Sequence, residues 1–216
     1  MGAQADKALL DTWITGWSAC RGYEPHDDGR TTSVLLTDQQ DQTEHFLFEP
    51  TTEQFLDVAA ETRQDPLRVL TVVTGRMQEL IDAAAPLGMR VTDRRQSLMS
   101  VDMAGQDVEA PRAPGDDFVL GRIRDGACRR VTVHSHGRLA ARGSVSAVGE
   151  YAVYDRIVTE EDFRRRGLGS YVMRALTADV LDDNVTLGLL MASADGRALY
   201  EFLGWQHLID VFVIRG

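Results

Sequence analysis

The segment Arg164-Arg165-Arg166-Gly167-Leu168-Gly169-Ser170 is the most informative stretch of the sequence. It lies between a predicted strand at 151–159 and a predicted helix at 170–181. Glycines at such a junction let the backbone approach a ligand closely, and the first N–H groups of the helix have no partner within it. Those amides and the helix dipole attract phosphate. With three arginines beside it, the segment predicts a loop that binds a pyrophosphate.

Two other phosphate-binding motifs fit this loop less well. A Walker loop needs lysine and then serine or threonine after its last glycine, and no lysine precedes Ser170. A dinucleotide fingerprint needs a third glycine where Val172 stands, and it normally occupies the first strand–turn–helix unit. On the loop alone, a glycine-rich turn flanked by solvated arginines stays open as the simpler interpretation, because Gly-x-Gly patterns occur by chance.

Hydrophobic periodicity outlines the rest of the chain. Apolar residues at spacings of three and four predict helices at 5–20, 51–62, 77–87, 170–181 and 196–203. Short apolar or alternating runs predict strands at 33–37, 45–48, 67–74, 89–103, 118–123, 130–134, 139–145, 151–159, 186–191 and 207–214. Prolines, glycines and acidic residues are frequent between residues 104 and 117. The pattern predicts an N-terminal α/β half at 1–105, a linker at 106–117 and a second domain at 118–216.

The surroundings of the loop favour one family. The pattern Arg-x-x-Gly-x-Gly, from Arg164 to Gly169, resembles the acetyl-CoA pyrophosphate loop of the GNAT superfamily of N-acetyltransferases. The segment 198–205, Ala-Leu-Tyr-Glu-Phe-Leu-Gly-Trp, resembles the family's Leu-Tyr-x-x-x-Gly-aromatic segment. The resemblance covers roughly the last hundred residues. It implies an α/β (α+β) fold: a mixed, mostly antiparallel twisted sheet flanked by helices.

The N-terminal half has two expected relations to that fold. Its strand–helix–strand unit at 67–103 is a candidate for a degenerate copy of the GNAT fold, although nothing in it resembles the pyrophosphate loop. The second half also lacks helices between its first two strands, where the family usually builds the acceptor site. We expect the N-terminal half to supply them.

The resemblance also implies roles for single residues. The residues implied in binding acetyl-CoA are Ile157, Val158, Thr159, Arg164, Arg165, Arg166, Gly167, Leu168, Gly169, Ser170 and Ser193. Ser193 stands where an asparagine is common, so its contact is expected to be weaker. Tyr200 matches the tyrosine that protonates the departing thiolate, a transfer that suits a phenol. The alternative for Tyr200 is a core aromatic with its hydroxyl at the rim.

Asp155 is the first candidate for the general base. It lies nine residues before Arg164, on the strand ahead of the loop. Period-two alternation puts it on the same face as Val153 and Ile157, where an apolar setting would raise the pKa of a carboxylate. The alternative is an ion pair with Arg156 or Arg142. The residues in reserve are Glu150, His134 and His136, each with a structural role as its own alternative.

Charge and cysteine content limit the possible binding partners and the expected cellular compartment. The formal net charge of −10 argues against nucleic acid or an anionic membrane as a partner. Cys20 and Cys128 lie far apart in the sequence, which disfavours a disulfide framework and makes a reducing cytoplasm the expected location. No spacing of His and Cys indicates a metal site.

Together these features predict an enzyme that uses acetyl-CoA to acetylate a small amine, with a homodimer as one option. A non-catalytic acyl-CoA sensor, a partner-binding module and a protein N-acetyltransferase are the alternatives.

Overall fold

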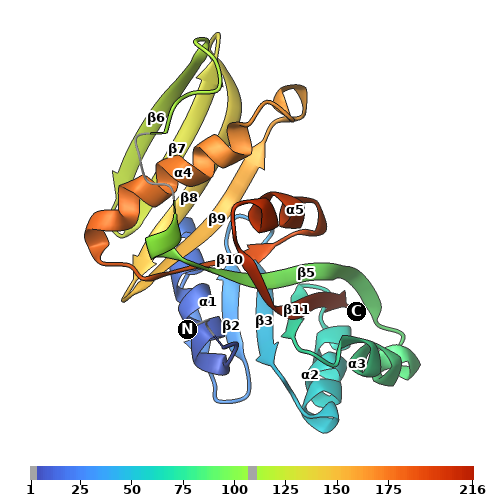
Figure 1. Cartoon of the computed structure of the whole chain (residues 1–216). Helices are drawn as coiled ribbons and strands as arrows, with labels where there is room; N and C mark the ends of the chain where they lie inside the picture. The colour runs from blue at the N-terminus through green and yellow to red at the C-terminus, as the bar shows by residue number, and fades with distance from the viewer. Residues whose placement is uncertain (1–3, 107–110) are drawn as a thin grey trace.

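The computed structural model describes residues 4–106 and 111–216, and in these residues eleven strands form one sheet (Figure 1). The helices are α1 (Lys7–Arg21), α2 (Thr52–Gln64), α3 (Met77–Ala84), α4 (Leu168–Val180) and α5 (Ala194–Phe202). The strands are β1 (Pro25–Asp27), β2 (Thr32–Leu36), β3 (Gln42–Phe48), β4 (Arg68–Val73), β5 (Arg90–Asp102), β6 (Phe118–Asp125), β7 (Cys128–Ser135), β8 (Arg138–Val148), β9 (Tyr151–Thr159), β10 (Leu187–Ala192) and β11 (Gln206–Arg215). The mixed α/β class is confirmed. Among the helices and strands just given, only β1 falls where a loop was predicted.

Local signals explain where the helices begin and end. The Asp6 side chain accepts a hydrogen bond from the Leu9 N–H at the start of α1, and Gly22 ends the helix with φ 71°. Thr51 caps α2 in the same way by accepting from the Gln54 N–H. Side-chain caps of this kind satisfy amides that have no acceptor within the helix, so the boundaries follow from the residue types.

The sheet runs through both halves of the chain, because each half places a strand inside the other. The strand order is β1-β2-β3-β4-β11-β5-β10-β9-β8-β7-β6. Strand β5 lies between β10 and β11, and β11 lies between β4 and β5; the contacts of β5 with both neighbours are antiparallel. The predicted linker at 106–117 includes residues 107–110, which lie outside the described residues, so the division of the chain stays a prediction.

The two halves repeat one arrangement of elements. The parallel pair β3–β4 is joined through α2 and followed by α3, and the parallel pair β9–β10 is joined through α4 and followed by α5. In both halves the pair is then flanked by the strand that comes from the other half. This repeat supports the interpretation of the N-terminal half as a degenerate copy.

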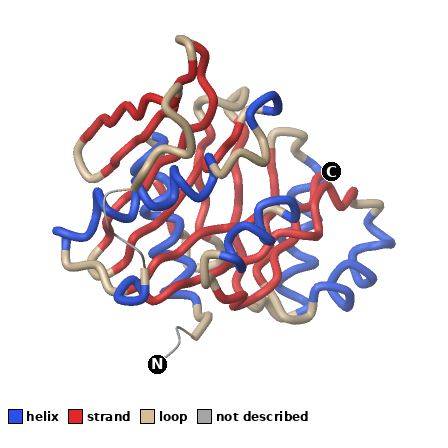
Figure 2. The backbone as a smooth tube through the Cα atoms, turned by 45° about the horizontal axis from the view of Figure 1, so that its top comes forward, coloured by secondary structure: helices blue, strands red, loops and turns tan. Residues whose placement is uncertain are grey.

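Helices cover both faces of the sheet (Figure 2). Leu98 and Leu189 point to the face covered by α1, where they pack with Trp13 and Trp17. Their neighbours Met99 and Leu190 point to the other face and join the core beneath α4. On that second face α2 and α3 cover β4 and β11, around Phe55 and Phe212. The alternation along each strand thus builds one core on each side.

The two cysteines contradict the expectation drawn from their separation. Cys20 ends up beside Cys128 and forms a disulfide with it across 108 residues, with 5.0 Å between the Cα atoms. The prediction of a reducing compartment rested on that separation and loses this support, because disulfides persist mainly in oxidising environments. Among the described residues, no helix is long and apolar enough to cross a membrane.

Candidate functional site

Strands β9 and β10 separate halfway along their length and open a site. Their parallel pairing runs from Tyr151–Leu187 to Tyr154–Leu190 and then stops, while β9 continues to Thr159. A cavity of about 620 Å³ lies beyond this split. The predicted site residues that line it are Ile157, Val158, Thr159, Arg164, Arg165, Gly167, Leu168, Gly169, Ser170, Ser193 and Tyr200.

The glycine loop forms the N-terminal end of α4 in this cavity. Gly167 precedes the helix with φ 79°, a left-handed conformation that favours glycine, and no side chain caps the helix. Leu168, Gly169 and Ser170 occupy the first turn, so their N–H groups have no acceptor within the helix. The loop therefore presents free amides and the positive end of the helix dipole to the cavity.

Gly169 lies at a close approach of α4 to the Leu199 side chain of α5. A Cβ atom at this position would lie 2.8 Å from Leu199 Cδ2, which is closer than real Cβ atoms approach. Leu199 lines the cavity together with Asp195 and Gly196, and the sequence analysis missed these three residues. The signal was the helical spacing: Gly196 lies one turn before Tyr200 on the same helix face.

The three arginines of the loop have different settings. Arg164 donates from Nε to the Thr159 carbonyl at 3.4 Å and lines the cavity. Arg165 also lines it, and within the described parts of the chain neither arginine forms an ion pair. Arg166 lies outside the lining, with its guanidinium 5.4 Å from the centre of the Phe163 ring. Two unneutralised cations thus flank the free amides of α4.

Tyr200 reaches the cavity from α5. Its residue is 7% exposed, and its ring lies 6.1 Å from the Trp205 ring. Its hydroxyl makes no hydrogen bond to any described residue. Burial, and then the negative charge of Asp155, raise the pKa of Tyr200 to about 12. The phenol therefore stays protonated across the neutral range and can donate to a group in the cavity.

A β-bulge in β9 overturns the predicted alternation around Asp155. Arg142 pairs with Val158 and Ser144 with Asp155, so one residue of β8 faces two of β9, and Arg156 has φ 53°. Val153 packs in the core under α1, whereas Ile157 packs against the core under α4. The prediction of a shared face for Val153, Asp155 and Ile157 was therefore wrong beyond the bulge.

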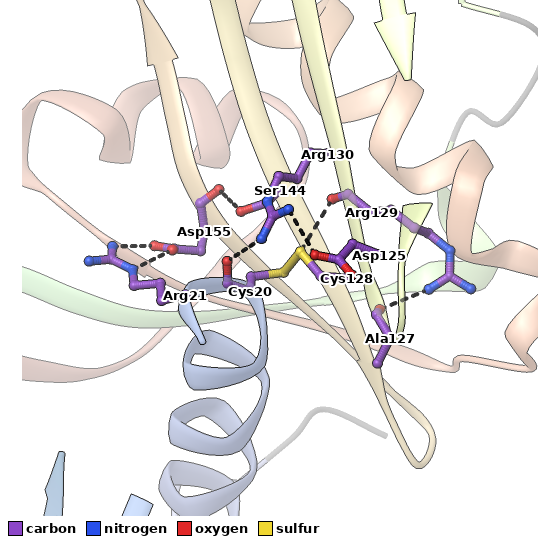
Figure 3. Close-up of a disulfide and its surroundings, with 9 residues drawn as sticks. All are labelled: Cys20, Arg21, Asp125, Ala127, Cys128, Arg129, Arg130, Ser144 and Asp155. Atoms are coloured by element: carbon purple, nitrogen blue, oxygen red, sulfur yellow. Dashed lines mark hydrogen bonds and ion pairs between the residues drawn. A yellow bond between two sulfur atoms is a disulfide. The ribbon is translucent and has the colours of Figure 1, made fainter. Parts of the chain in front are cut away.

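Asp155 forms an ion pair, but with neither of the arginines that were considered. Arg21, the last residue of α1, donates from Nε to Oδ2 at 2.7 Å and from Nη2 to Oδ1 at 2.9 Å (Figure 3). The two side chains are 15% and 12% exposed. Arg156 instead pairs with Asp38. Asp155 is outside the cavity lining, on the α1 side of β9.

The three residues held in reserve lie away from the cavity. Glu150 accepts a hydrogen bond from Thr186 Oγ1 at 2.9 Å, near the start of β9. His134 lies in β7 opposite Val119, and His136 occupies the following turn with φ 49°. In the chain as described, no group of three or more His, Cys, Asp or Glu residues is placed to hold a metal ion.

Comparison with known proteins gives a family match and several matches in fold. Residues 137–213 match the family model described as FR47-like protein. A GCN5-related N-acetyltransferase from Kribbella flavida is 12% identical with a TM-score of 0.68, over 99% of this chain and 96% of that chain. A GCN5-related N-acetyltransferase-like protein from Streptococcus suis is 12% identical with a TM-score of 0.59, over 95% and 93%.

A third similar structure has two copies of the fold. It is a tandem GNAT protein from the clavulanic acid biosynthesis pathway, 15% identical with a TM-score of 0.55, over 85% of this chain and 78% of that chain. At these identities the likeness concerns the fold, and it agrees with the repeat seen between the two halves.

Proposed function

We propose that the chain is a member of the GNAT superfamily and that it transfers the acetyl group of acetyl-CoA to the amine of a small molecule. The observation that carries the proposal is the arrangement of the cavity. Free amides and two arginines with no ion-pair partner among the described residues lie at one end, and Tyr200, whose protonated hydroxyl has no partner among those residues, lines the same cavity. The first end suits a pyrophosphate and the second suits a leaving thiolate.

Residues beside the gap between β9 and β10 would hold acetyl-CoA, the acetyl donor. The amides of Leu168, Gly169 and Ser170 would bind the pyrophosphate, with Arg164 and Arg165 beside them. Strand β10 does not pair with β9 beyond Tyr154, so the backbone groups of 157–159 that face the split are available to a pantetheine arm. The cavity volume of about 620 Å³ lies within the usual range for small-molecule sites.

The chemistry requires the movement of two protons. The amine nitrogen, once unprotonated, attacks the thioester carbon; the C–S bond then breaks and the electron pair leaves with the sulfur. With a pKa of about 12, Tyr200 is a weaker acid than an ordinary thiol. It would therefore stabilise the sulfur by a hydrogen bond while charge develops, and share its proton as the bond breaks.

Asp155 remains our candidate to receive the proton from the amine. Arg21 occupies one lone-pair site on each carboxylate oxygen, and a carboxylate has about four such sites. The remaining sites can accept a hydrogen bond from an ammonium group. We place the acceptor on the α1 side of the split, where Asp155 lies, because the loop and α5 border the cavity on the other side.

The direct test is turnover with a panel of small amines, measured as release of free thiol, together with acetyl-CoA affinity by calorimetry. Tyr200→Phe should lower kcat about a hundredfold or more while acetyl-CoA affinity stays the same. Tyr151→Phe, a change of the same kind on β9 outside the cavity, is the matched control and should leave kcat unchanged.

Two other outcomes would separate the alternatives. Ser193 Oγ caps α5 by accepting a hydrogen bond from the Gly196 N–H at 3.2 Å, so it is less available for a contact with acetyl-CoA. This keeps a non-catalytic acyl-CoA-binding module as an alternative. Tight binding of acetyl-CoA with no turnover of any amine would support that module. An intact protein that does not bind acetyl-CoA would contradict both functions.

A further inference from the structure

Three contacts attach the last turn of α1 to the strands of the second half (Figure 3). Cys20 is bonded to Cys128 of β7, and its carbonyl accepts a hydrogen bond from Arg130 Nη2 at 2.8 Å. The next residue, Arg21, forms the bidentate pair with Asp155 of β9. Since α1 belongs to the N-terminal half, these contacts bring an N-terminal cation to the site of the C-terminal half.

The pair stands where the split begins. Asp155 is the first residue of β9 beyond the last pair with β10, Tyr154–Leu190, and it directly precedes the bulge at Arg156. Its side chain faces α1, while residues 157–159 line the cavity. Asp155 is also near enough to Tyr200 for its charge to act on the phenol. Its carboxylate thus lies on the α1 side of β9, within electrostatic reach of Tyr200.

Arg21 itself is held tightly. Its guanidinium lies 5.1 Å from the centre of the Trp17 ring, one helical turn earlier, and the ion pair is nearly closed to solvent. Two parallel charge-assisted hydrogen bonds fix the orientation of a carboxylate as well as its position. The end of a helix normally frays, and a covalent bond one residue away suppresses that motion.

We propose that Arg21 is a positioning residue, which orients Asp155 towards the acceptor amine, and that the Cys20–Cys128 bond holds Arg21 in that place. The proposal rests on the function proposed above. It goes beyond that function by giving the N-terminal helix a role in acceptor binding, and by making that role depend on the redox state of two cysteines.

The Cys20–Cys128 disulfide holds the end of α1 in place and responds only slowly to a reductant. Cys20 and Cys128 are 4% and 2% exposed, so a reductant reaches them only when the end of α1 opens. A dithiol then breaks the S–S bond: each cysteine sulfur gains a hydrogen, and the dithiol is oxidised to its own disulfide. Both cysteines become thiols, and α1 keeps only its noncovalent contacts.

The test compares four variants for amine KM, kcat and acetyl-CoA affinity. Arg21→Gln and the double variant Cys20→Ala/Cys128→Ala should raise the amine KM about tenfold or more, while acetyl-CoA affinity changes less than about twofold. Arg21→Lys should recover part of the loss, because it restores the charge without the bidentate geometry. Arg122→Gln, which removes an exposed pair with Asp179 of 3.0 Å, is the matched control and should change nothing.

Treatment with a reductant tests the contribution of the disulfide separately from that of Arg21. Prolonged treatment with a dithiol should shift the wild-type KM to that of the cysteine variant and leave the cysteine variant unaffected. Thiol titration of the untreated, denatured protein should find no free thiol. Two free thiols, or an amine KM that stays the same in Arg21→Gln and in the cysteine variant, would overturn the proposal.

A readout independent of turnover keeps the proposal testable if no amine is accepted. Hydrogen exchange over residues 18–24 and 153–157 should increase in the reduced protein and in Arg21→Gln, and not in Arg122→Gln. Unchanged exchange at 153–157 would overturn the positioning role. Failure of acetyl-CoA to bind would instead count against the proposed function, so the two failures are distinguishable.

Discussion

Tyr200 combines a nearly buried ring with a hydroxyl that has no partner in the described chain. Burial and the charge of Asp155 raise its pKa from 10.0 to about 12. Because the folded value lies above the unfolded one, the neutral phenol stabilises the fold fully below pH 10, and this contribution is lost as the pH rises through about 12. In the neutral range Tyr200 therefore stays protonated and can donate a hydrogen bond.

This pKa can be measured by the absorbance of tyrosinate. The difference between the titrations of wild type and Tyr200→Phe isolates one phenol. We expect no step in that difference near pH 10, and a step only as the pH approaches about 12. A full step near pH 10 would mean that the Tyr200 hydroxyl is solvated, which would contradict its burial in this structure.

At this scale the sequence revealed what is local. The loop from Arg164 to Ser170 was predictable because a phosphate site at a helix start needs glycines and free amides in consecutive residues. The partner of Asp155 was not, because Arg21 lies 134 positions earlier and meets it only in the folded chain. The bulge at Arg156 leaves no mark in the hydrophobic pattern, so the face of Ile157 was predicted incorrectly.

Among the elements, α1 lies unusually close to the sheet at one residue. A Cβ atom on Gly16 would lie 2.5 Å from the Val153 Cβ atom of β9. Rotating a side chain cannot relieve this contact, because the backbone fixes the position of both Cβ atoms. Gly16 is thus what lets the helix rest on β9 and place Arg21 beside Asp155.

Gly16→Ala should therefore destabilise the protein. Alanine in a helix gains about 1 kcal/mol over glycine, but forcing an atom into a packed contact costs about 1–3 kcal/mol, so we expect a net loss of up to about 2 kcal/mol. Urea unfolding measures it, with Thr15→Ala on the exposed side of α1 as the control. A Gly16→Ala protein as stable as wild type would show that α1 sits farther from β9.

Across the whole molecule, the exchange of β5 and β11 joins the two halves. Helix and strand positions followed from periodicity, since each depends on residues near one another. The strand order could not be derived from them, because pairing between β5 and β11 is decided by the combined core and not by either segment.

Separate halves should consequently fail to fold. A fragment of residues 118–216 loses β5 from between β10 and β11, together with the core residues Met99, Val101 and Met103. We expect it to show no cooperative thermal transition by circular dichroism and no affinity for acetyl-CoA. A soluble, cooperatively unfolding fragment would establish the second half as an independent domain.

The disulfide adds a covalent link between the halves, and its loss should lower the stability of the whole chain. Chain entropy alone predicts about 4.7 kcal/mol for a loop of roughly this length, and disulfides typically stabilise a fold by about 2–4 kcal/mol. Urea midpoints of the wild-type protein with and without a dithiol should differ accordingly, and those of Cys20→Ala/Cys128→Ala should coincide. Equal midpoints for the wild type in both conditions would contradict the link.

The central claim is that the first turn of α4 binds the pyrophosphate of acetyl-CoA, and calorimetric titration of the folded protein with acetyl-CoA tests it most directly. Gly167→Glu places a carboxylate at the mouth of the loop. Gly29→Glu is the matched control, since Gly29 has a similar φ of 82° in open space. We predict micromolar binding to the wild type and to Gly29→Glu, and none to Gly167→Glu. No binding by the intact protein, or equal binding by all three, would contradict the claim.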